Sequence, residues 1–210
     1  MGSGTKIKIC GIKNLETLNL CVDLSVDYVG INFSPKSIRK ITWEQTKILL
    51  ETRKNPNFPK VVFLFFLNDT NFIGETVNQF SPDLVQLVDG DHLVPLELKN
   101  FYLDKKILLP SFRIQNQITD ETTLEPKAEL VILDSFKKGE GGGTGHSFPW
   151  EYVKTIKRPY LLAGGITPDN VINAIQTLSP FGIDVASGVE TDGEKDLNKI
   201  KTLVQNVRRI

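Results

Sequence analysis

The stretch Lys60-Val-Val-Phe-Leu-Phe-Phe-Leu67 is a nearly unbroken apolar run of strand length. Parallel strands that are covered on both faces have this pattern, because neither face meets water. With it, the chain carries eight candidate strands, and helix-like windows separate many of them. The other seven are Lys6–Cys10, Asp27–Phe33, Asp83–Leu87, Lys106–Leu109, Glu129–Leu133, Tyr160–Ala163 and Gly182–Val185.

The helix-like windows carry start signals of different quality. Asn14 is a good cap for the first helix, whereas Thr42-Trp-Glu-Gln45 resembles a capping box only loosely, because Glu44 comes one residue early. The remaining expected helices follow Pro168 or span Leu93–Leu103, Ile114–Glu125 and Asp196–Val207. Eight strands alternating with helices in 210 residues predict a compact eight-stranded parallel β/α (TIM) barrel, with a doubly wound open sheet as the alternative.

Length and composition indicate the domain organisation and exclude several classes of protein. We expect residues 1–4 to be a leader and residues 5–210 to form a single domain. The 25 basic and 25 acidic residues cancel, so no overall field points to nucleic acid or an acidic membrane. Cys10 and Cys21 suggest neither disulfides nor a metal site, and the spacing of His92 and His146 does not resemble that of metal ligands. The longest apolar stretch is too short to span a bilayer, so we expect a cytoplasmic protein. No obvious exposed apolar stripe demands a partner, so we expect a monomer.

Three side chains near predicted strand ends are candidates for chemistry. Cys10 ends the first strand beside Gly11, although a cysteine there is often only a small buried hydrophobe. Asp134 follows an apolar strand that would make it a usable acid; alternatively, it caps a helix or pairs with a nearby lysine. Arg39 lies in the loop after the second strand, where it would bind a carboxylate in bidentate fashion or simply be solvated.

Three glycine-bearing segments occur late in the chain. The Gly139–Gly145 loop suits either a lid over a ligand or a flexible linker. The turns Gly164-Gly165 and Ser187-Gly188 follow the last two predicted strands, where barrel proteins commonly bind phosphate. The alternative for both turns is that a tight connection needs glycine for backbone reasons alone.

Taken in order, several segments closely resemble one family, the phosphoribosylanthranilate isomerases of tryptophan biosynthesis. They are Lys8-Ile-Cys-Gly-Ile12, Phe33-Ser-Pro-Lys-Ser-Ile-Arg39, Leu133-Asp134 with Gly142-Gly-Thr-Gly145 and Phe148-Pro-Trp150, Leu162–Val171, and Ile183–Glu190 with Gly193 and Lys195-Asp196. The resemblance implies a β/α barrel that performs an Amadori rearrangement on a phosphosugar, without cofactor or metal. This aldose–ketose isomerisation converts N-(5'-phosphoribosyl)anthranilate to 1-(2-carboxyphenylamino)-1-deoxyribulose 5-phosphate.

The resemblance also implies roles for individual residues. Cys10 matches the general base, Asp134 the general acid and Arg39 the arginine near the anthranilate carboxylate. The phosphate-binding turns match Gly164, Gly165, Ser187 and Gly188. Because a free thiol needs help to ionise near neutrality, we expect Lys8, two residues back on the same strand face, to assist Cys10.

Some segments depart from the family pattern, and two other functions stay open. Val88-Asp-Gly90 replaces the usual histidine and glycine, Pro149 and Ala186 replace an aspartate and a serine, and Leu109–Arg113 is unusual. The related aminoaldose isomerase of histidine biosynthesis would carry an aspartate in place of Cys10. A phosphosugar-binding barrel without turnover is the alternative from a different class.

Overall fold

Eight parallel strands close into a barrel in the order β1-β2-β3-β4-β5-β6-β7-β8. The structure is a computed structural model that describes residues 4–88, 94–118, 128–135 and 149–210. Because β1 pairs with both β2 and β8, the sheet has no free edge, and the open-sheet alternative is wrong. The strands are β1 Lys6–Cys10, β2 Tyr28–Asn32, β3 Lys60–Phe65, β4 Leu84–Val88, β5 Leu108–Ile114, β6 Val131–Ser135, β7 Tyr160–Leu162 and β8 Gly182–Val185.

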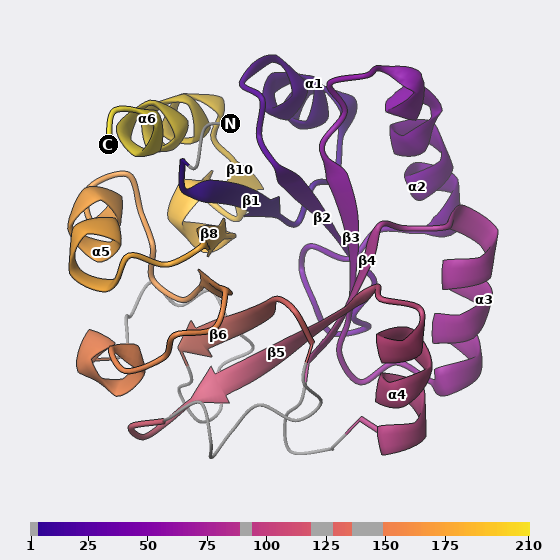
Figure 1. Ribbon diagram of the computed structural model, residues 1–210. Coiled ribbons are helices and arrows are strands. Elements are labelled where there is room, and N and C mark those ends of the chain that lie inside the picture. The colour runs from indigo at the N-terminus through magenta and orange to yellow at the C-terminus, as the bar shows by residue number, and fades with distance from the viewer. Residues whose placement is uncertain (1–3, 89–93, 119–127, 136–148) are drawn as a thin grey trace.

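Helices surround the barrel, with α1 to α4 along one side and α5 and α6 along the other (Figure 1). In the described residues the α-helices are α1 Leu15–Asp23, α2 Trp43–Leu50, α3 Thr70–Phe80, α4 Leu96–Asp104, α5 Val171–Leu178 and α6 Leu197–Arg208. Short 3₁₀ turns follow α2, β6 and β8, and a two-stranded hairpin precedes α6. These are η1 Glu51–Lys54, η2 Trp150–Val153, η3 Ser187–Val189, β9 Glu190–Thr191 and β10 Glu194–Lys195.

The helix starts show why these residues begin helices. The Asn14 side chain accepts a hydrogen bond from the backbone N–H of Thr17 at 2.9 Å, as predicted. Thr42 and Gln45 form a complete capping box, with bonds of 3.3 and 2.8 Å. The expectation of a loose capping box was wrong because it weighed Glu44 and overlooked the amide of Gln45, which serves equally well at this position.

The fifth strand differs most from its prediction. β5 runs from Leu108 to Ile114, so the unusual segment Leu109–Arg113 lies inside the strand rather than after it. Ladder bonds to β4 and β6 hold this segment extended although its apolar run is broken. The prediction of a helix over Ile114–Glu125 is therefore wrong for its first residues, because Ile114 belongs to β5 and residues 115–118 are not helical. Its continuation lies outside the described residues.

The core has two parts. Alternate strand residues such as Ile7, Ile9, Ile183 and Val185 pack outward against the helices in one large cluster. Their neighbours point into the barrel, where a smaller separate cluster fills the interior. The buried residues of this smaller cluster are Tyr28, Val62, Leu109, Ile132, Leu161 and Ala163. Since Ile7 and Ile9 face outward, Lys8 and Cys10 face the barrel interior.

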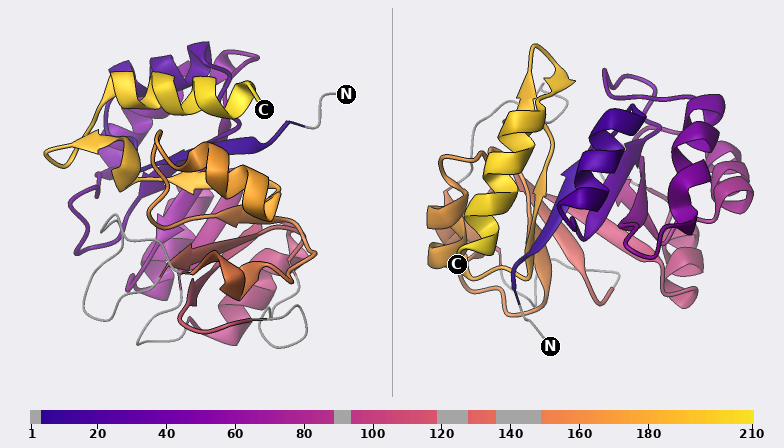
Figure 2. Two further views of the ribbon diagram at one scale, coloured as in Figure 1. Left: turned by 90° about the vertical axis from the view of Figure 1, so that its left-hand side faces the viewer. Right: turned by 90° about the horizontal axis from the view of Figure 1, so that it is seen from above.

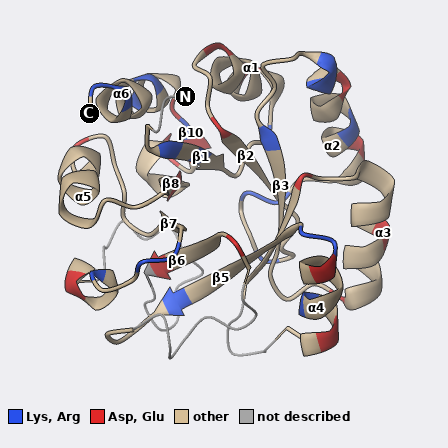
Figure 3. Ribbon diagram, in the orientation of Figure 1, with Lys and Arg blue, Asp and Glu red and all other residues tan. Residues whose placement is uncertain are grey.

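The two described ends of the chain lie close together (Figure 2). Arg208 of α6 donates to the carbonyl of Thr5 at 3.1 Å and to the carboxylate of Asp27 at 3.0 Å. Acidic and basic residues are interspersed along the outer helices α2 and α4 (Figure 3). None of the helices among the described residues is both long and apolar enough to cross a membrane.

Candidate active site

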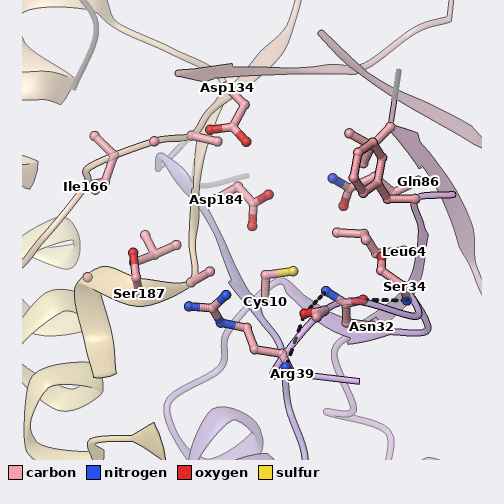
Figure 4. Close-up of a pocket in the computed structure, with 18 of the residues that line it drawn as sticks. Cys10, Asn32, Ser34, Arg39, Leu64, Gln86, Asp134, Ile166, Asp184 and Ser187 are labelled. Carbon is pink, nitrogen blue, oxygen red and sulfur yellow. Dashed lines mark hydrogen bonds between the residues drawn. The ribbon is translucent and has the colours of Figure 1, made fainter. Parts of the chain in front are cut away.

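A cavity of about 150 Å³ opens at the carboxyl ends of the barrel strands. It is lined by all seven residues predicted as site residues, which are Cys10, Arg39, Asp134, Gly164, Gly165, Ser187 and Gly188. Figure 4 shows the side chains of Cys10, Arg39, Asp134 and Ser187, which come from different strands and loops, around one space. Closure of the barrel brings them together, because parallel strands end at the same rim.

Cys10 is the last residue of β1, and the residue is only 5% exposed. The neighbouring strand makes room for it with a glycine, since a Cβ atom at Gly30 would lie 2.7 Å from the Cys10 Sγ. Burial raises the pKa of Cys10 above its ordinary value, and Asp184 adds to this. The positive charges of Lys8 and Lys195 act in the opposite direction without overcoming burial.

Lys8 lies fully buried beneath Cys10 and is held by two polar side chains of the barrel interior. Its Nζ donates to both carboxylate oxygens of Asp184 at 2.9 Å and to Oε1 of Gln86 at 3.0 Å. Burial alone would lower the pKa of Lys8, but the charge of Asp184 raises it above its ordinary value. Lys8 thus has the position expected for an aid to Cys10, but its charge is largely neutralised by Asp184.

Arg39 extends along the backbone beside Cys10, where a Cβ atom at Gly11 would lie 2.6 Å from its Cδ. Its Nε and Nη2 donate to the two carboxylate oxygens of Glu190 at 2.7 and 2.6 Å. The side chain is 12% exposed, so the alternative of a solvated arginine is wrong. In this conformation the guanidinium already makes the bidentate contact that its chemistry favours, with a carboxylate of the chain itself.

The two predicted glycine turns pack directly against each other. Gly164 and Gly165 have φ angles of +84° and +68°, which only glycine adopts readily. A Cβ atom at Gly188 would lie 1.8 Å from the carbonyl oxygen of Ile166, so this close approach of the two turns requires glycine. Asn170 closes the first turn, since its side chain bonds the N–H of Thr167 and the carbonyl of Gly165.

Asp134 lies near the end of β6, one residue beyond the buried Leu133, and lines the cavity. It pairs in register with Arg113 of β5, whose guanidinium lies 4.7 Å from the ring centroid of Phe66. The expected lysine partners Lys137 and Lys138 lie outside the described residues, as do the Gly139–Gly145 loop, His92 and His146.

The prediction omitted several polar residues that shape this cavity. Gln86, Asp184 and Asn32 line it, and Glu190 holds Arg39. Gln86 and Asp184 had a signal in the sequence, because each interrupts a short apolar strand with a group that needs a buried partner. For Glu190, the sequence showed only a charge after the last strand.

The described residues contain no group of three or more His, Cys, Asp or Glu side chains placed to hold a metal ion. A closed β/α barrel with a thiol, a carboxylate and two glycine turns around one cavity has the organisation of an acid–base barrel enzyme.

Comparison with known proteins specifies this class. Residues 7–206 match the family described as N-(5'-phosphoribosyl)anthranilate (PRA) isomerase. The chain is 43% identical over 206 residues to the N-(5'-phosphoribosyl)anthranilate isomerase of Leptospira interrogans serogroup Icterohaemorrhagiae serovar copenhageni, covering 97% of this chain and 95% of that protein. It is 36% identical over 208 residues to the Aquifex aeolicus enzyme of the same name, covering 97% and 98% of the two chains.

Comparison with solved structures gives the same family as the sequence comparison. The phosphoribosyl anthranilate isomerase of Thermotoga maritima superposes with a TM-score of 0.84 at 30% identity, covering 98% of this chain and 100% of that one. A phosphoribosyl anthranilate isomerase in complex with reduced 1-(O-carboxyphenylamino)-1-deoxyribulose 5-phosphate gives a TM-score of 0.80 at 29% identity, with the same coverage. The chain therefore belongs to the N-(5'-phosphoribosyl)anthranilate isomerase family, and the predicted isomerase class and barrel fold are confirmed.

Proposed function

We propose that this chain converts N-(5'-phosphoribosyl)anthranilate to 1-(2-carboxyphenylamino)-1-deoxyribulose 5-phosphate, a step of tryptophan biosynthesis, with Cys10 as base and Asp134 as acid. The observation that carries the proposal is that one cavity brings together Cys10, Asp134, Arg39 and both glycine turns. Family membership supplies the reaction, and the geometry supports the assignment of roles to residues.

The reaction needs two proton transfers, and the site has a group for each. Asp134, as the acid, protonates the furanose ring oxygen, so that the ring opens to a Schiff base. Cys10, as a thiolate, then removes the proton from C2 of the sugar, which gives an enolamine that tautomerises to the ketone. The carboxylic acid and the thiolate act on different atoms, which fits their positions on different strands, β6 and β1.

Substrate binding follows from the remaining groups. The turns at Gly164-Gly165 and Ser187-Gly188 present backbone N–H groups to a phosphate, as is common after the last two strands of a barrel. Arg39 binds the anthranilate carboxylate. Because Glu190 already occupies two of its N–H groups, the substrate carboxylate either uses the remaining donors or displaces Glu190.

The decisive experiment is turnover of the fluorescent aminoaldose by the purified chain. We expect conversion to the aminoketose without added metal or cofactor. If the chain instead converts the larger two-phosphate aminoaldose of histidine biosynthesis, it is the related isomerase. If it binds the product tightly but does not turn over the substrate, it is a phosphosugar-binding protein. The raised pKa of Cys10 leads us to expect kcat/KM to rise with pH through the neutral range.

The position of the thiol gives a further test. Gly30→Ala places a methyl group 2.7 Å from the Cys10 Sγ and 3.0 Å from its Cα, so the thiol and strand β1 must shift. We expect kcat to fall by about tenfold or more and the free energy of unfolding to fall by about 1–3 kcal/mol. Turnover assays and denaturant titrations measure both quantities.

Gly74→Ala is the matched control for Gly30→Ala. Gly74 lies in α3, and a Cβ atom there meets nothing within 4 Å. This substitution should leave kcat unchanged and stabilise the helix by about 0.5–1 kcal/mol. Equal kcat values for Gly30→Ala and Gly74→Ala would show that the thiol position does not matter.

A further inference from the structure

Arg39, Glu190 and Lys195 form a buried cluster of charges at the edge of the cavity. Lys195 Nζ donates to Oε1 of Glu190 at 2.6 Å, and Arg39 binds the same carboxylate through both of its oxygens. The three side chains are 3%, 6% and 12% exposed for Lys195, Glu190 and Arg39 respectively. Two positive charges thus share one negative charge in a place with little access to water.

The β9–β10 hairpin fixes this cluster. Lys195 and Glu190 are directly opposite each other in its antiparallel ladder. Lys195 Nζ also donates to the carbonyl of Ala186 at 2.8 Å, which ties the hairpin to the end of β8. Lys199 of α6 donates to the backbone carbonyl of Glu190 at 2.7 Å. The carboxylate that orients Arg39 is therefore held on a rigid element.

The charges around Cys10 do not cancel. The pair Lys8–Asp184 beneath the thiol contributes one positive and one negative charge. The cluster at the cavity edge adds two positive charges and one negative charge. Asp134 lines the same cavity, as do Arg113 and Lys36, so the positive charges outnumber the negative ones. Burial raises the pKa of Cys10, and the charge of Asp184 raises it further. The positive charges of Lys8 and Lys195 lower the pKa of Cys10. Lys195 thus adds an opposing charge beyond the neutralised pair below the thiol.

We propose that Lys195 is a positioning residue for the isomerase reaction. It holds Glu190, and through Glu190 the guanidinium of Arg39, and its positive charge favours the thiolate form of Cys10. This inference rests on the function proposed above for Cys10. It gives the β9–β10 hairpin, which lies outside the barrel, a direct influence on proton transfer within it.

Lys195→Met tests the proposal. We expect kcat/KM at neutral pH to fall about tenfold, and to recover toward the wild-type value as the pH is raised and the thiolate forms. Ultraviolet absorbance of the thiolate, taken as the difference from the same protein with Cys10→Ala, measures ionisation without turnover. Its midpoint should move to higher pH in Lys195→Met and stay near the wild-type position in Lys195→Arg.

Glu190→Gln provides a prediction of opposite sign. It removes the negative charge and leaves the guanidinium of Arg39 together with Lys195, whose own pKa is lowered by burial and which keeps its charge below that pKa. The thiolate midpoint should therefore move to lower pH, and this variant tests the proposal even if Lys195→Met folds poorly. Glu194→Gln is the matched control, because it breaks the separate Lys13–Glu194 ion pair of the same hairpin. It should leave the midpoint and the pH profile unchanged.

Two outcomes would overturn the proposal. One is a loss of kcat/KM that is equal at every pH, with an unmoved thiolate midpoint, which would make the hairpin a structural support only. The other is a midpoint that moves in the same direction in Lys195→Met and Glu190→Gln. If Cys10→Ala retains turnover while the two midpoints still move oppositely, the function proposed for Cys10 is wrong and the electrostatic inference stands.

Discussion

We expect Cys10→Ala and Asp134→Asn each to lower kcat by at least ~100-fold, which is the usual scale for loss of a positioned base or acid. Alanine removes the atom that abstracts the proton from C2. Asparagine keeps the shape of Asp134, but its amide has no acidic proton to transfer to the ring oxygen. Since the glycine turns and Arg39 remain, KM should change far less than kcat. Steady-state kinetics with the fluorescent aminoaldose separates the two parameters.

The chain contains matched controls for both variants. Cys21 is its other cysteine, fully buried in α1 and facing the helix-packing cluster, so Cys21→Ala should alter stability and leave kcat unchanged. Asp104→Asn at the exposed end of α4 serves the same purpose for the carboxylate. Wild-type turnover by either Cys10→Ala or Asp134→Asn would remove that residue from the mechanism.

The barrel could be predicted because each strand carries its own signal. β8 was predicted with its observed bounds, Gly182–Val185, since a short apolar run between a helix and a glycine turn has no competing interpretation. β5 could not be delimited in this way. Pro110, Ser111 and Arg113 break its apolar run, and only pairing with β4 and β6 shows that the chain stays extended. Pairing with neighbouring strands therefore determined the bounds of β5, because the local sequence pattern was ambiguous.

The site residues could be predicted because strand ends of a barrel meet at one rim. The ion pairs that Arg39 and Lys8 form could not be predicted from the sequence. Arg39 and Glu190 are 151 residues apart, and Lys8 and Asp184 are 176 apart. No local spacing relates such residues, so the sequence suggested a ligand for Arg39 and a thiol for Lys8 but missed the carboxylate that binds each of them. Closure of β8 against β1 creates the second pair directly, since Lys8 and Asp184 are register partners.

Lys8→Met should lower the free energy of unfolding by about 3–5 kcal/mol, the range found when one partner of a buried ion pair is removed. The substitution keeps the apolar bulk of the side chain but leaves the Asp184 carboxylate, which is 8% exposed, without its buried cation. Denaturant titration at neutral pH measures the loss.

The double variant Lys8→Met/Asp184→Leu separates the ion pair from packing. Because it removes both charges together, it should recover most of the lost stability. If Lys8→Met alone were as stable as the wild type, the pair would contribute nothing to the barrel interior.

The pH dependence of this loss has a definite sign. The folded-state pKa of Lys8 is raised above its ordinary value of 10.5, so the pair contributes its full stability below that pH. The contribution is lost as the pH rises through the folded-state value. The difference between wild type and Lys8→Met should therefore narrow at strongly alkaline pH.

The same variant tests whether Lys8 assists Cys10. Removing the lysine takes away a charge that lowers the pKa of the thiol and leaves Asp184, which raises it. The pH–rate profile of Lys8→Met should therefore move to higher pH, and the double variant should bring it back toward the wild-type position. A profile that stays in place in Lys8→Met would show that Lys8 supports the barrel without helping the thiol to ionise, and would leave Lys195 as the cation that does.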